Sequence, residues 1–303
     1  MRVLITGASG VLGSSIYDAF ASAQAGHTVL GLARSRASNN LRSIDLLDRA
    51  QTDATLREFK PDWLIHCAAE RKPDVAEKDP EGTRKLNVSV PEHLAELSKE
   101  LGFTLIYIST DYVFDGTSPP YVPSARTNPL NLYGHTKRDG ELSVLGIEGA
   151  IAVVLRVPVL YGPAPSNEDS AVNILLDVVQ DQSGKTYKMD HFQTRYPTNV
   201  LDIAGFLVRL ADSPHARQHT IPPILHYSAP EPFTKYEMCL VFARILGLPH
   251  THIVPDANEP LPGSTPRPRD TQLYVRETEE LGVEGGLGTT GFEEWWETRL
   301  KPV

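Results

Sequence analysis

The sequence predicts an α/β fold: a Rossmann-type, doubly wound parallel sheet followed by a smaller C-terminal α/β substrate lobe. Short apolar strands alternate with amphipathic helices in the first half, and a glycine-rich turn follows the first strand. From about Tyr161 onwards, prolines and polar residues break this alternation. Such alternation requires parallel strands joined by right-handed crossovers, with helices on both faces. We therefore expect a Rossmann domain over residues 1–160 and a substrate-binding lobe over residues 161–303.

The hydrophobic pattern predicts the individual elements. Short apolar runs bounded by turn residues are typical of buried strands, and longer amphipathic runs are typical of helices. The expected strands cover residues 2–6, 28–33, 63–67, 103–109 and 150–155. The expected helices cover residues 11–21, 80–101 with an interruption near Val90-Pro91, 132–145, 171–180, 200–211, 235–246 and 292–300. Residues 255–269 form an ordered but irregular loop in this scheme.

Composition limits the class of protein. With 41% hydrophobic and 22% charged residues among 303, the chain resembles an ordinary globular protein. The net charge of −9 and the lack of a Lys/Arg-rich run argue against a nucleic-acid partner. No apolar run approaches the length of a membrane helix, and the chain starts with a strand, so we expect neither a membrane span nor a signal peptide. Its two cysteines fit reduced thiols in the cytoplasm.

The glycine-rich turn indicates a dinucleotide site. In the pattern Gly7-x-x-Gly10-x-x-Gly13, the first glycine permits a tight turn and the second lets the backbone approach a diphosphate. The third lets the following helix pack closely on the strand, and the helix N-terminus offers N–H groups to the anion. An ordinary glycine-rich turn is the alternative, but the strand before and the helix after favour the cofactor site. The predicted contacts are Gly7, Ser9, Gly10, Val11, Leu12 and Gly13.

The end of the second predicted strand selects the cofactor. An NAD enzyme places an acidic residue there to bind the ribose 2′-hydroxyl. This chain has Arg34, Ser35 and Arg36 instead, and two arginines can bind a 2′-phosphate, so we expect NADP(H). Solvated loop charges are the alternative interpretation. Four further residues are assigned to the cofactor on weaker grounds: Asp45 and Leu46 beside the adenine, and Ala68 and Ala69 after the third strand.

A tyrosine and a lysine four residues apart predict proton transfer next to that cofactor. Tyr133 and Lys137 share one face of a helix. The phenol has an ordinary pKa of about 10, which a neighbouring ammonium lowers by about 1–3. Tyr133 can then protonate a carbonyl oxygen as hydride arrives, while Lys137 also contacts the nicotinamide ribose. Thr110, at the end of the fourth strand, is expected to polarise the carbonyl, and Asn87 to support Lys137 through water.

The substrate side is predicted from arginines and loops. Arg71, Arg126 and Arg195 are candidates for an anionic substrate, although a solvated or salt-bridged surface residue is the more common explanation of any single arginine. Of these we assign Arg71 and Arg195 to the substrate, together with Asp111 and Tyr112. The turn-rich loop over residues 115–121 is expected to flank the pocket. No metal is expected, because no His or Cys pair has ligand spacing.

At these motifs the chain resembles the extended short-chain dehydrogenase/reductase superfamily. Residues 108–116 and 133–137 resemble the dTDP-4-dehydrorhamnose reductase family, which reduces the 4-keto group of a nucleotide sugar. Residues 66–75, 128–134, 189–198 and 234–238 are more similar to the regulatory β-subunit branch of methionine adenosyltransferase. The resemblance covers nearly the whole chain.

The resemblance implies two alternative functions. The first is NADPH-dependent reduction of a carbonyl, in a 4-keto nucleotide sugar or another small ketone or imine, with Tyr133 as proton donor. The second is a non-catalytic, NADP-bound regulatory β subunit, which docks on the catalytic α subunit of methionine adenosyltransferase. The short, charged C-terminal end, residues 295–303, differs from the longer tail expected of the regulatory subunit and favours the reductase.

Overall fold

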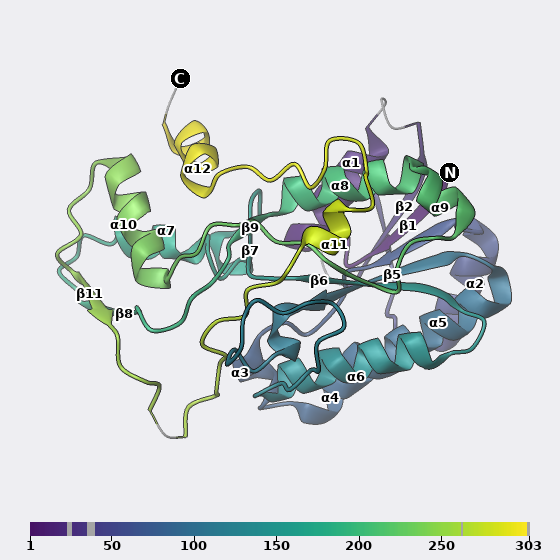
Figure 1. Cartoon of the computed structure of the whole chain (residues 1–303), viewed down its shortest axis with the longest axis horizontal. Helices are drawn as coiled ribbons and strands as arrows, with labels where there is room; N and C mark the ends of the chain where they lie inside the picture. The colour runs from purple at the N-terminus through teal and green to yellow at the C-terminus, as the bar shows by residue number, and fades with distance from the viewer. Residues whose placement is uncertain (23–25, 35–39, 262, 302–303) are drawn as a thin grey trace.

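A parallel sheet forms the centre of the computed structural model, which describes residues 1–22, 26–34, 40–261 and 263–301. Seven strands pair in the order β10-β6-β5-β4-β1-β2-β3 (Figure 1). Every pairing in this sheet is parallel. The strands are β1 (Arg2–Thr6), β2 (Thr28–Ala33), β3 (Leu41–Ser43), β4 (Trp63–His66), β5 (Thr104–Thr110), β6 (Ile151–Val157) and β10 (Ile224–His226).

The strand order reverses between β1 and β4. From β1 the chain builds outwards through β2 and β3, then returns to add β4, β5, β6 and β10 on the other side. Ligands of open α/β sheets bind at such a switch point, outside the carboxyl ends of the strands. The glycine-rich turn follows β1 directly, so the fold places it at the switch point.

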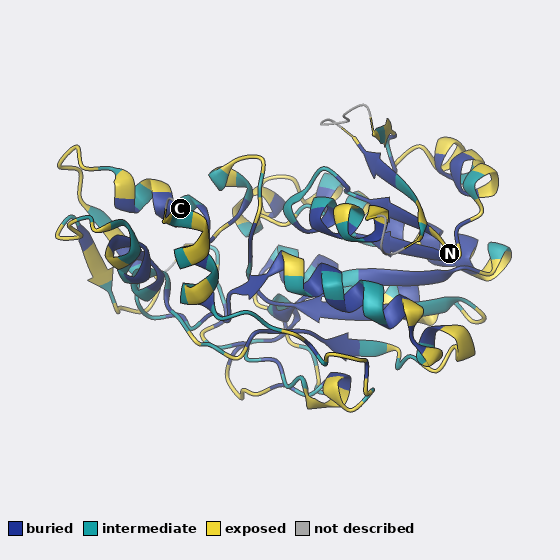
Figure 2. Ribbon diagram, turned by 90° about the horizontal axis from the view of Figure 1, so that it is seen from above, coloured by how far each residue is buried: buried dark blue, intermediate teal, exposed yellow. Residues whose placement is uncertain are grey.

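Helices cover both faces of the sheet. On one face, α1 (Val11–Ala21) and α8 (Val200–Asp212) pack their apolar sides on β1, β4, β5 and β6. On the other face lie α2 (Arg49–Phe59), α5 (Val90–Leu101) and α6 (Leu132–Gly146). The strands are therefore buried from both sides, as the dark ribbons of Figure 2 show. The doubly wound α/β fold that the sequence predicts is confirmed.

A smaller lobe follows β6. Its core is formed by aromatic and aliphatic side chains of α7 (Ile174–Gln180), α10 (Lys235–Leu246) and α12 (Phe292–Leu300). Tyr161 lies at its centre, with ring contacts to Phe292, Trp295 and Trp296. Two small parallel pairs complete it: β7 (Leu160–Tyr161) with β9 (Thr198–Asn199), and β8 (Tyr187–Asp190) with β11 (Ile253–Asp256).

The predicted division of the chain at residue 160 does not follow the sheet. β10, well beyond this boundary, pairs with β6 as an edge strand. α8 lies in the same core as α1, and α9 (Pro214–Gln218) follows it on that face (Figure 1). Two elements of the second half of the sequence, β10 and α8, thus belong to the first unit. The change in proline content near Tyr161 gives no sign of this.

The predicted helix over residues 80–101 has three parts. α4 (Pro80–Arg84) and α5 are separated by a π-helical turn, η1 (Lys85–Ser89), so the interruption lies just before the expected Val90-Pro91. The pattern gave no expectation for α2 or β3. The remaining short elements are α3 (Pro73–Ala76), η2 (Asp111–Val113), η3 (Asn167–Asp169) and α11 (Arg276–Glu279).

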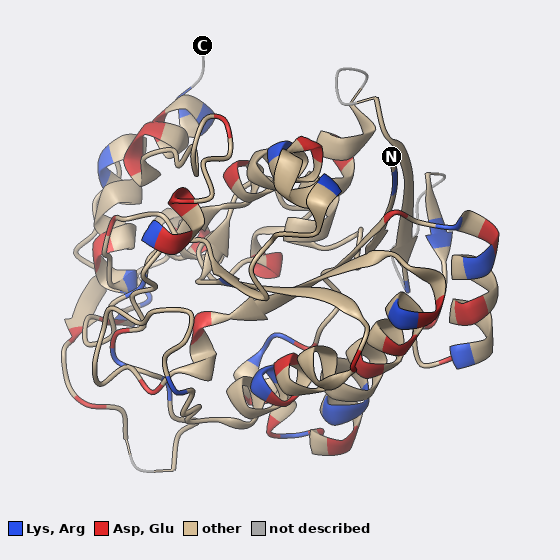
Figure 3. Cartoon of the chain, turned by 45° about the vertical axis from the view of Figure 1, so that its right-hand side comes forward, with Lys and Arg blue, Asp and Glu red and all other residues tan. Residues whose placement is uncertain are grey.

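Charged residues of both signs are interspersed along the outer helices (Figure 3). Two ion pairs, Arg49–Glu96 and Arg57–Glu100, join α2 to α5 at 2.6 and 2.7 Å. Within the described part of the chain, none of the helices has the length and apolar character needed to cross a bilayer.

Candidate functional site

The glycine-rich turn is closed by contacts between backbone atoms. Gly7 has a φ of +66°, and a Cβ added there would lie 2.8 Å from the amide nitrogen of Ala68. A Cβ on Gly13 would lie 2.2 Å from the carbonyl oxygen of Gly7. The amide of Gly10 donates to that same carbonyl at 2.9 Å. Side chains are excluded at Gly7 and Gly13 by this packing, so the turn presents backbone atoms at the switch point.

The N-terminus of α1 fits an anion. Gly10 is its N-cap residue, no side chain caps the first turn, and that turn carries no acidic residue. Its leading N–H groups and the positive end of the helix dipole therefore face the turn without a competing carboxylate. Ser9 and Val11 are half-buried beside it, whereas the Leu12 side chain belongs to the core and leaves only its backbone for a ligand. A cofactor diphosphate fits this arrangement.

The end of β2 presents one described arginine. Arg34 is exposed, and its Nε lies 3.6 Å from a carboxylate oxygen of Asp45. Ser35 and Arg36, predicted to act with it, lie outside the described residues. The Leu46 side chain is buried in the core, so only its backbone can line a cofactor cleft. Besides Arg34, the Asp45 carboxylate accepts from the Leu47 amide at 3.0 Å.

Two alanines continue the turn beyond β4. Ala68 and Ala69 are half-buried, and Ala68 lies directly behind Gly7. Their small side chains leave the backbone of this turn close to that of the glycine loop. This placement is compatible with the predicted cofactor contact.

Tyr133 and Thr110 meet at the start of α6 and the end of β5. Asn131 begins the helix, because its side chain accepts from the Gly134 amide at 2.9 Å. This cap fixes Tyr133 in the first turn, with the Thr110 hydroxyl as a hydrogen-bond partner of its phenol. Burial raises the pKa of Tyr133 well above its ordinary value, and the contact with Thr110 acts in the opposite direction.

Lys137 lies one turn further along α6 and points into the protein. Its Nζ donates to the Ile108 carbonyl oxygen at 2.8 Å and lies 3.9 Å from the centre of the Tyr107 ring. Burial lowers the pKa of Lys137 to about 7, while the Glu141 carboxylate acts against this. Burial has the largest effect on the Tyr133 pKa and raises it. The net shift is therefore opposite to the decrease expected from a neighbouring ammonium.

A buried charged network lies behind Lys137. Glu141 and Arg156 are 3% and 2% exposed, and they form two hydrogen bonds of 2.9 and 2.7 Å. Ser109 donates to the same carboxylate at 2.5 Å, and Nη1 of Arg156 lies 3.2 Å from Nε2 of His226. Because Arg156 can only donate, that histidine nitrogen accepts, and Nδ1 of His226 carries the proton towards the Tyr274 carbonyl at 3.2 Å.

Asn87 braces the cofactor side from the π-helical turn. Its side-chain oxygen accepts from the Glu70 amide at 2.9 Å, and its nitrogen donates to the Glu70 carbonyl at 2.9 Å and to Thr136 at 3.1 Å. The backbone carbonyl of Asn87, in the π-helical turn, accepts from the Tyr107 hydroxyl at 3.2 Å. Asn87 therefore fixes the turn after β4 and the neighbouring helix, and its support of Lys137 through water stays a prediction.

The predicted substrate residues meet above Tyr133. Asp111 is buried and accepts from Thr110 at 3.1 Å and from the hydroxyl of Thr271. Burial raises the pKa of Asp111, whereas Thr271 and the Arg195 guanidinium act against this. Arg195 is 3% exposed and lies over the Tyr112 ring, whose centre is 5.6 Å from its Cζ.

The Arg195 guanidinium also has backbone partners. It donates to the carbonyls of Thr194 and Pro268, at 2.9 and 3.0 Å, and to the side chain of Gln193. Lys235 lies near both Arg195 and Arg267, and burial together with these two charges lowers the pKa of Lys235. Of the three, Arg267 forms an ion pair with Asp74 at 2.7 Å.

Arg71 is the remaining predicted substrate residue and lies near Tyr133. It is half-exposed, and its guanidinium is 4.0 Å from a carboxylate oxygen of Asp169 in the second lobe. This long contact spans the two lobes, and the Arg71 charge acts on Tyr133. Arg71, Asp111, Tyr112 and Arg195 thus form one group of neighbouring side chains around Tyr133.

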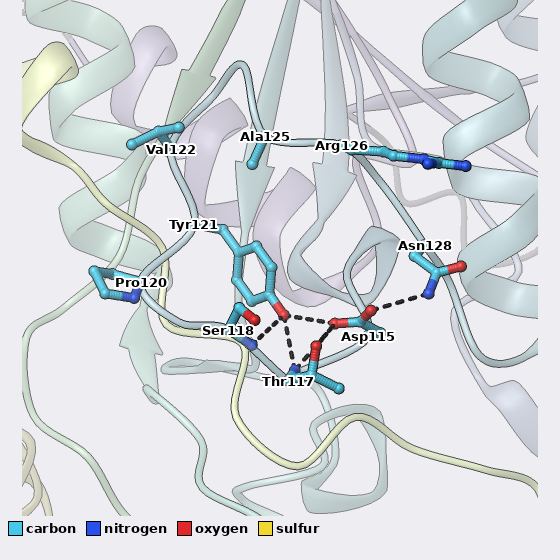
Figure 4. Close-up of a pocket in the computed structure, with 9 residues that line it drawn as sticks. All are labelled: Asp115, Thr117, Ser118, Pro120, Tyr121, Val122, Ala125, Arg126 and Asn128. Carbon is cyan, nitrogen blue, oxygen red and sulfur yellow. Dashed lines mark hydrogen bonds between the residues drawn. The ribbon is translucent and has the colours of Figure 1, made fainter.

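The turn-rich loop after β5 lines a separate hollow of about 500 Å³ (Figure 4). Asp115 organises it by accepting from the Tyr121 hydroxyl, from Thr117 and from Asn128, at 2.7 to 3.0 Å. These bonds hold the pKa of Asp115 well below its ordinary value despite its partial burial. Arg126 is one of the residues that line this hollow, and Tyr133 is not among them. That this loop flanks the substrate pocket stays a prediction.

Sequence reasoning missed Glu141, Arg156, His226, Lys235 and Arg267. Glu141 had a signal, since it lies four residues after Lys137 on one helix face. Arg156 also had one, because an arginine in an otherwise apolar strand requires a buried partner. The others come together only through the fold. In the described part of the chain, no cluster of His, Cys, Asp or Glu is arranged to hold a metal.

Comparison with known proteins identifies the family. The model of the RmlD substrate binding domain family matches residues 1–291. "Methionine adenosyltransferase 2 subunit beta" from Xenopus tropicalis is 47% identical over 283 residues, covering 93% of this chain and 83% of that protein. "dTDP-4-keto-6-deoxy-D-glucose reductase" from Streptomyces niveus is 28% identical, with 93% and 91% covered.

Among solved structures, dTDP-4-dehydrorhamnose reductase from Bacillus anthracis in complex with NADP has a TM-score of 0.82 at 24% identity, covering 98% of this chain and 97% of that one. This likeness extends over both lobes and agrees with the fold described above. The chain belongs to the RmlD substrate binding domain family, within the extended short-chain dehydrogenase/reductases.

Proposed function

We propose that this chain is a β-type regulatory subunit of a methionine adenosyltransferase that carries NADP(H) in the cleft between its lobes. The observation behind this proposal is the difference in identity, 47% to the β subunit against 28% to the reductase over the same share of this chain. The preference for the reductase drawn from the C-terminal end is therefore reversed. Function in this proposal comes from binding a catalytic subunit, and the Tyr133 cluster is inherited with the fold.

The glycine loop, Arg34 and Lys137 supply the cofactor contacts in this proposal. The uncapped N-terminus of α1 holds the diphosphate, and Arg34 meets the 2′-phosphate. The bound cofactor supplies a rigid ligand between the lobes, and a hydride donor if reduction occurs. No acidic residue at the described end of β2 opposes the 2′-phosphate except Asp45, which is half-exposed and paired with Arg34.

Mixing with a methionine adenosyltransferase catalytic subunit tests the proposal. We expect a complex that co-elutes in size-exclusion chromatography at micromolar concentration and alters the rate of S-adenosylmethionine formation. The matched control is a dTDP-sugar reductase of the same family, which should elute alone. If this chain also elutes alone and leaves the rate unchanged, the regulatory proposal is contradicted.

The second candidate is an NADPH-dependent carbonyl reductase. The contact between Thr110 and Tyr133, with Lys137 one helical turn away, favours it. The phenol is protonated at neutral pH and can give its proton to an alkoxide formed by hydride transfer. Catalysis would require Lys137 to leave Ile108 and approach the phenol, because Thr110 and Arg71 oppose the effect of burial on the Tyr133 pKa without cancelling it.

Single-turnover oxidation of NADPH tests the reductase. Against a panel of keto-sugar nucleotides, small ketones and imines, a reductase should oxidise NADPH with at least one compound. Tyr133→Phe should abolish this oxidation and leave NADPH binding nearly intact. Oxidation that survives Tyr133→Phe would contradict the assigned proton donor, and tight NADPH binding without oxidation would leave the regulatory function as the better account.

A further inference from the structure

Lys137 is a buried cation without a carboxylate in direct contact among the described residues. Only 2% of it is exposed, and its Nζ has one hydrogen bond, to Ile108, and the face of the Tyr107 ring. Burying an ammonium is costly unless an opposite charge compensates it. The groups around it from the adjoining strands are the rings of His66 and Tyr107 and the thiol of Cys67, all uncharged at neutral pH.

The nearest compensating charge is on the same helix. Glu141 follows Lys137 by four residues, so the two side chains lie on one face of α6. The Glu141 carboxylate is the first group that opposes the effect of burial on Lys137. Its distance is too great for an ion pair, so it acts through the low-dielectric interior.

Three contacts hold the Glu141 carboxylate in place. Arg156 binds both of its oxygens, and Ser109 donates to one of them. Arg156 also donates to the Pro123 carbonyl at 3.0 Å, and its Cζ lies 5.1 Å from the centre of the Phe114 ring. Of this ion pair, the carboxylate is the group that opposes the effect of burial on Lys137.

The same contacts set the position of α6 on β5. Lys137 binds the carbonyl of Ile108, Glu141 accepts from Ser109, and Tyr133 meets Thr110. Three consecutive residues of β5 therefore receive three side chains from successive turns of α6. Loss of the Glu141 contact would disturb both the charge and the location of Lys137.

We propose that Glu141 is a positioning residue that acts through Lys137: its carboxylate, fixed by Arg156 and Ser109, holds the Lys137 ammonium charged against Ile108 and available to the cofactor. This role of Glu141 applies to the cofactor-free protein. The effect of Glu141 on NADP(H) binding rests in addition on the proposed function.

The test is a direct titration of Lys137 by nuclear magnetic resonance in cofactor-free protein with isotope-labelled lysine side chains, assigned with Lys137→Arg. The wild-type midpoint is expected at about pH 7. In Glu141→Gln the midpoint should move to acid by about tenfold or more in proton concentration. Glu148→Gln, which neutralises an exposed carboxylate beyond the end of α6, should leave it unchanged. An unchanged midpoint in Glu141→Gln would overturn the proposal.

A second variant tests the same proposal in case Glu141→Gln does not fold. The double variant Glu141→Gln, Arg156→Met removes both buried charges, a replacement that folded proteins often tolerate. It should show the same acid displacement of the Lys137 midpoint. A wild-type midpoint in this folded variant would overturn the proposal.

NADPH binding provides the second arm. Near pH 7 the dissociation constant of Glu141→Gln should be larger than that of wild type by about fivefold or more, since the charged fraction of Lys137 falls from about one half to about one tenth or less. A displaced titration with unchanged NADPH affinity would overturn the link to the cofactor. If neither protein binds NADPH, the cofactor part of the proposed function fails, and the titration still decides the role of Glu141.

Discussion

Two regions of the molecule are built differently. The backbone-built region, around β1 and β4, is held by close contacts between backbone atoms. The charged region, beside β5, β6 and β10, is held by contacts between charged side chains. In the first region, Gly13 packs against the carbonyl of Gly7 with no room for a methyl group. In the second, Glu141, Arg156 and His226 form a buried network with almost no exposed surface. Both regions lie towards the carboxyl ends of the strands of the same sheet.

The difference concerns what each region can tolerate. A cleft made of backbone is insensitive to pH but fails when atoms are added, because backbone cannot move aside cheaply. A cleft backed by buried charges accepts changes of shape but fails when one charge is left without its partner. Steric and electrostatic substitutions should therefore separate the two regions.

The largest effect is expected from Gly13→Ala. The new Cβ would lie 2.2 Å from the Gly7 carbonyl oxygen, so α1 or the turn must shift. We expect the free energy of unfolding to fall by about 4 kcal/mol or more, measured by urea denaturation. Gly146→Ala is the control, since its Cβ would meet nothing within 4 Å; it should be neutral or stabilising by up to about 1 kcal/mol. Equal effects of the two would contradict the steric account.

The next effect is expected from Arg156→Met. This change leaves the Glu141 carboxylate buried with Ser109 as its remaining partner and should lower the free energy of unfolding by about 3 kcal/mol. Arg42→Met breaks an ion pair of the same length, 2.7 Å, on the surface and should change it by less than about 1 kcal/mol. Restoration of stability on adding Glu141→Gln would support the charge account, and no restoration would argue against it.

A pH effect is expected in the charged region from His226. Burial lowers the pKa of His226 to about 3, and the Arg156 charge adds to this. The unfolded chain binds a proton near pH 6.5, so stability present above that pH is lost as the pH falls towards 3. Between pH 7 and 5 the loss is about 1–2 kcal/mol for this one histidine.

His226→Gln keeps a donor for Tyr274 and an acceptor for Arg156 without a titrating ring. Urea denaturation at the two pH values should therefore show a smaller difference for His226→Gln than for wild type. His250→Gln, at an exposed position, should behave like wild type. A wild-type difference in His226→Gln would show that the loss arises elsewhere, for example at His66, whose pKa burial also lowers to about 3.

The backbone-built region was the more predictable from sequence. Its glycines occupy fixed positions in one short segment, and the strand and helix around them follow from local apolar patterns. Tyr133, Lys137 and Thr110 were found for the same reason, since a helix face and a strand end are local features. The fold class and most elements of the first half followed from such patterns.

The charged region was not predictable in the same way. Glu141, Arg156 and His226 lie on α6, β6 and β10, and they meet only because β10 returns to the sheet after a long excursion. The direction of the Lys137 side chain also depends on tertiary packing, and burial raised the pKa of Tyr133 where a neighbouring charge was expected to lower it. Desolvation depends on the whole fold, so spacing alone cannot give its sign.

The smallest effect is expected in the backbone-built region, from a substitution of Arg34 at the end of β2. If Arg34 binds the 2′-phosphate, Arg34→Ala should raise the dissociation constant for NADPH about tenfold and leave that for NADH unchanged, as measured by fluorescence titration. Arg57→Ala, which removes an exposed arginine of α2, should change neither. Because Asp45 holds the Arg34 guanidinium at 3.6 Å, Asp45→Asn should act in the opposite direction and tighten NADPH binding. Equal losses for both cofactors in Arg34→Ala would mean that Arg34 shapes the turn and does not select the phosphate.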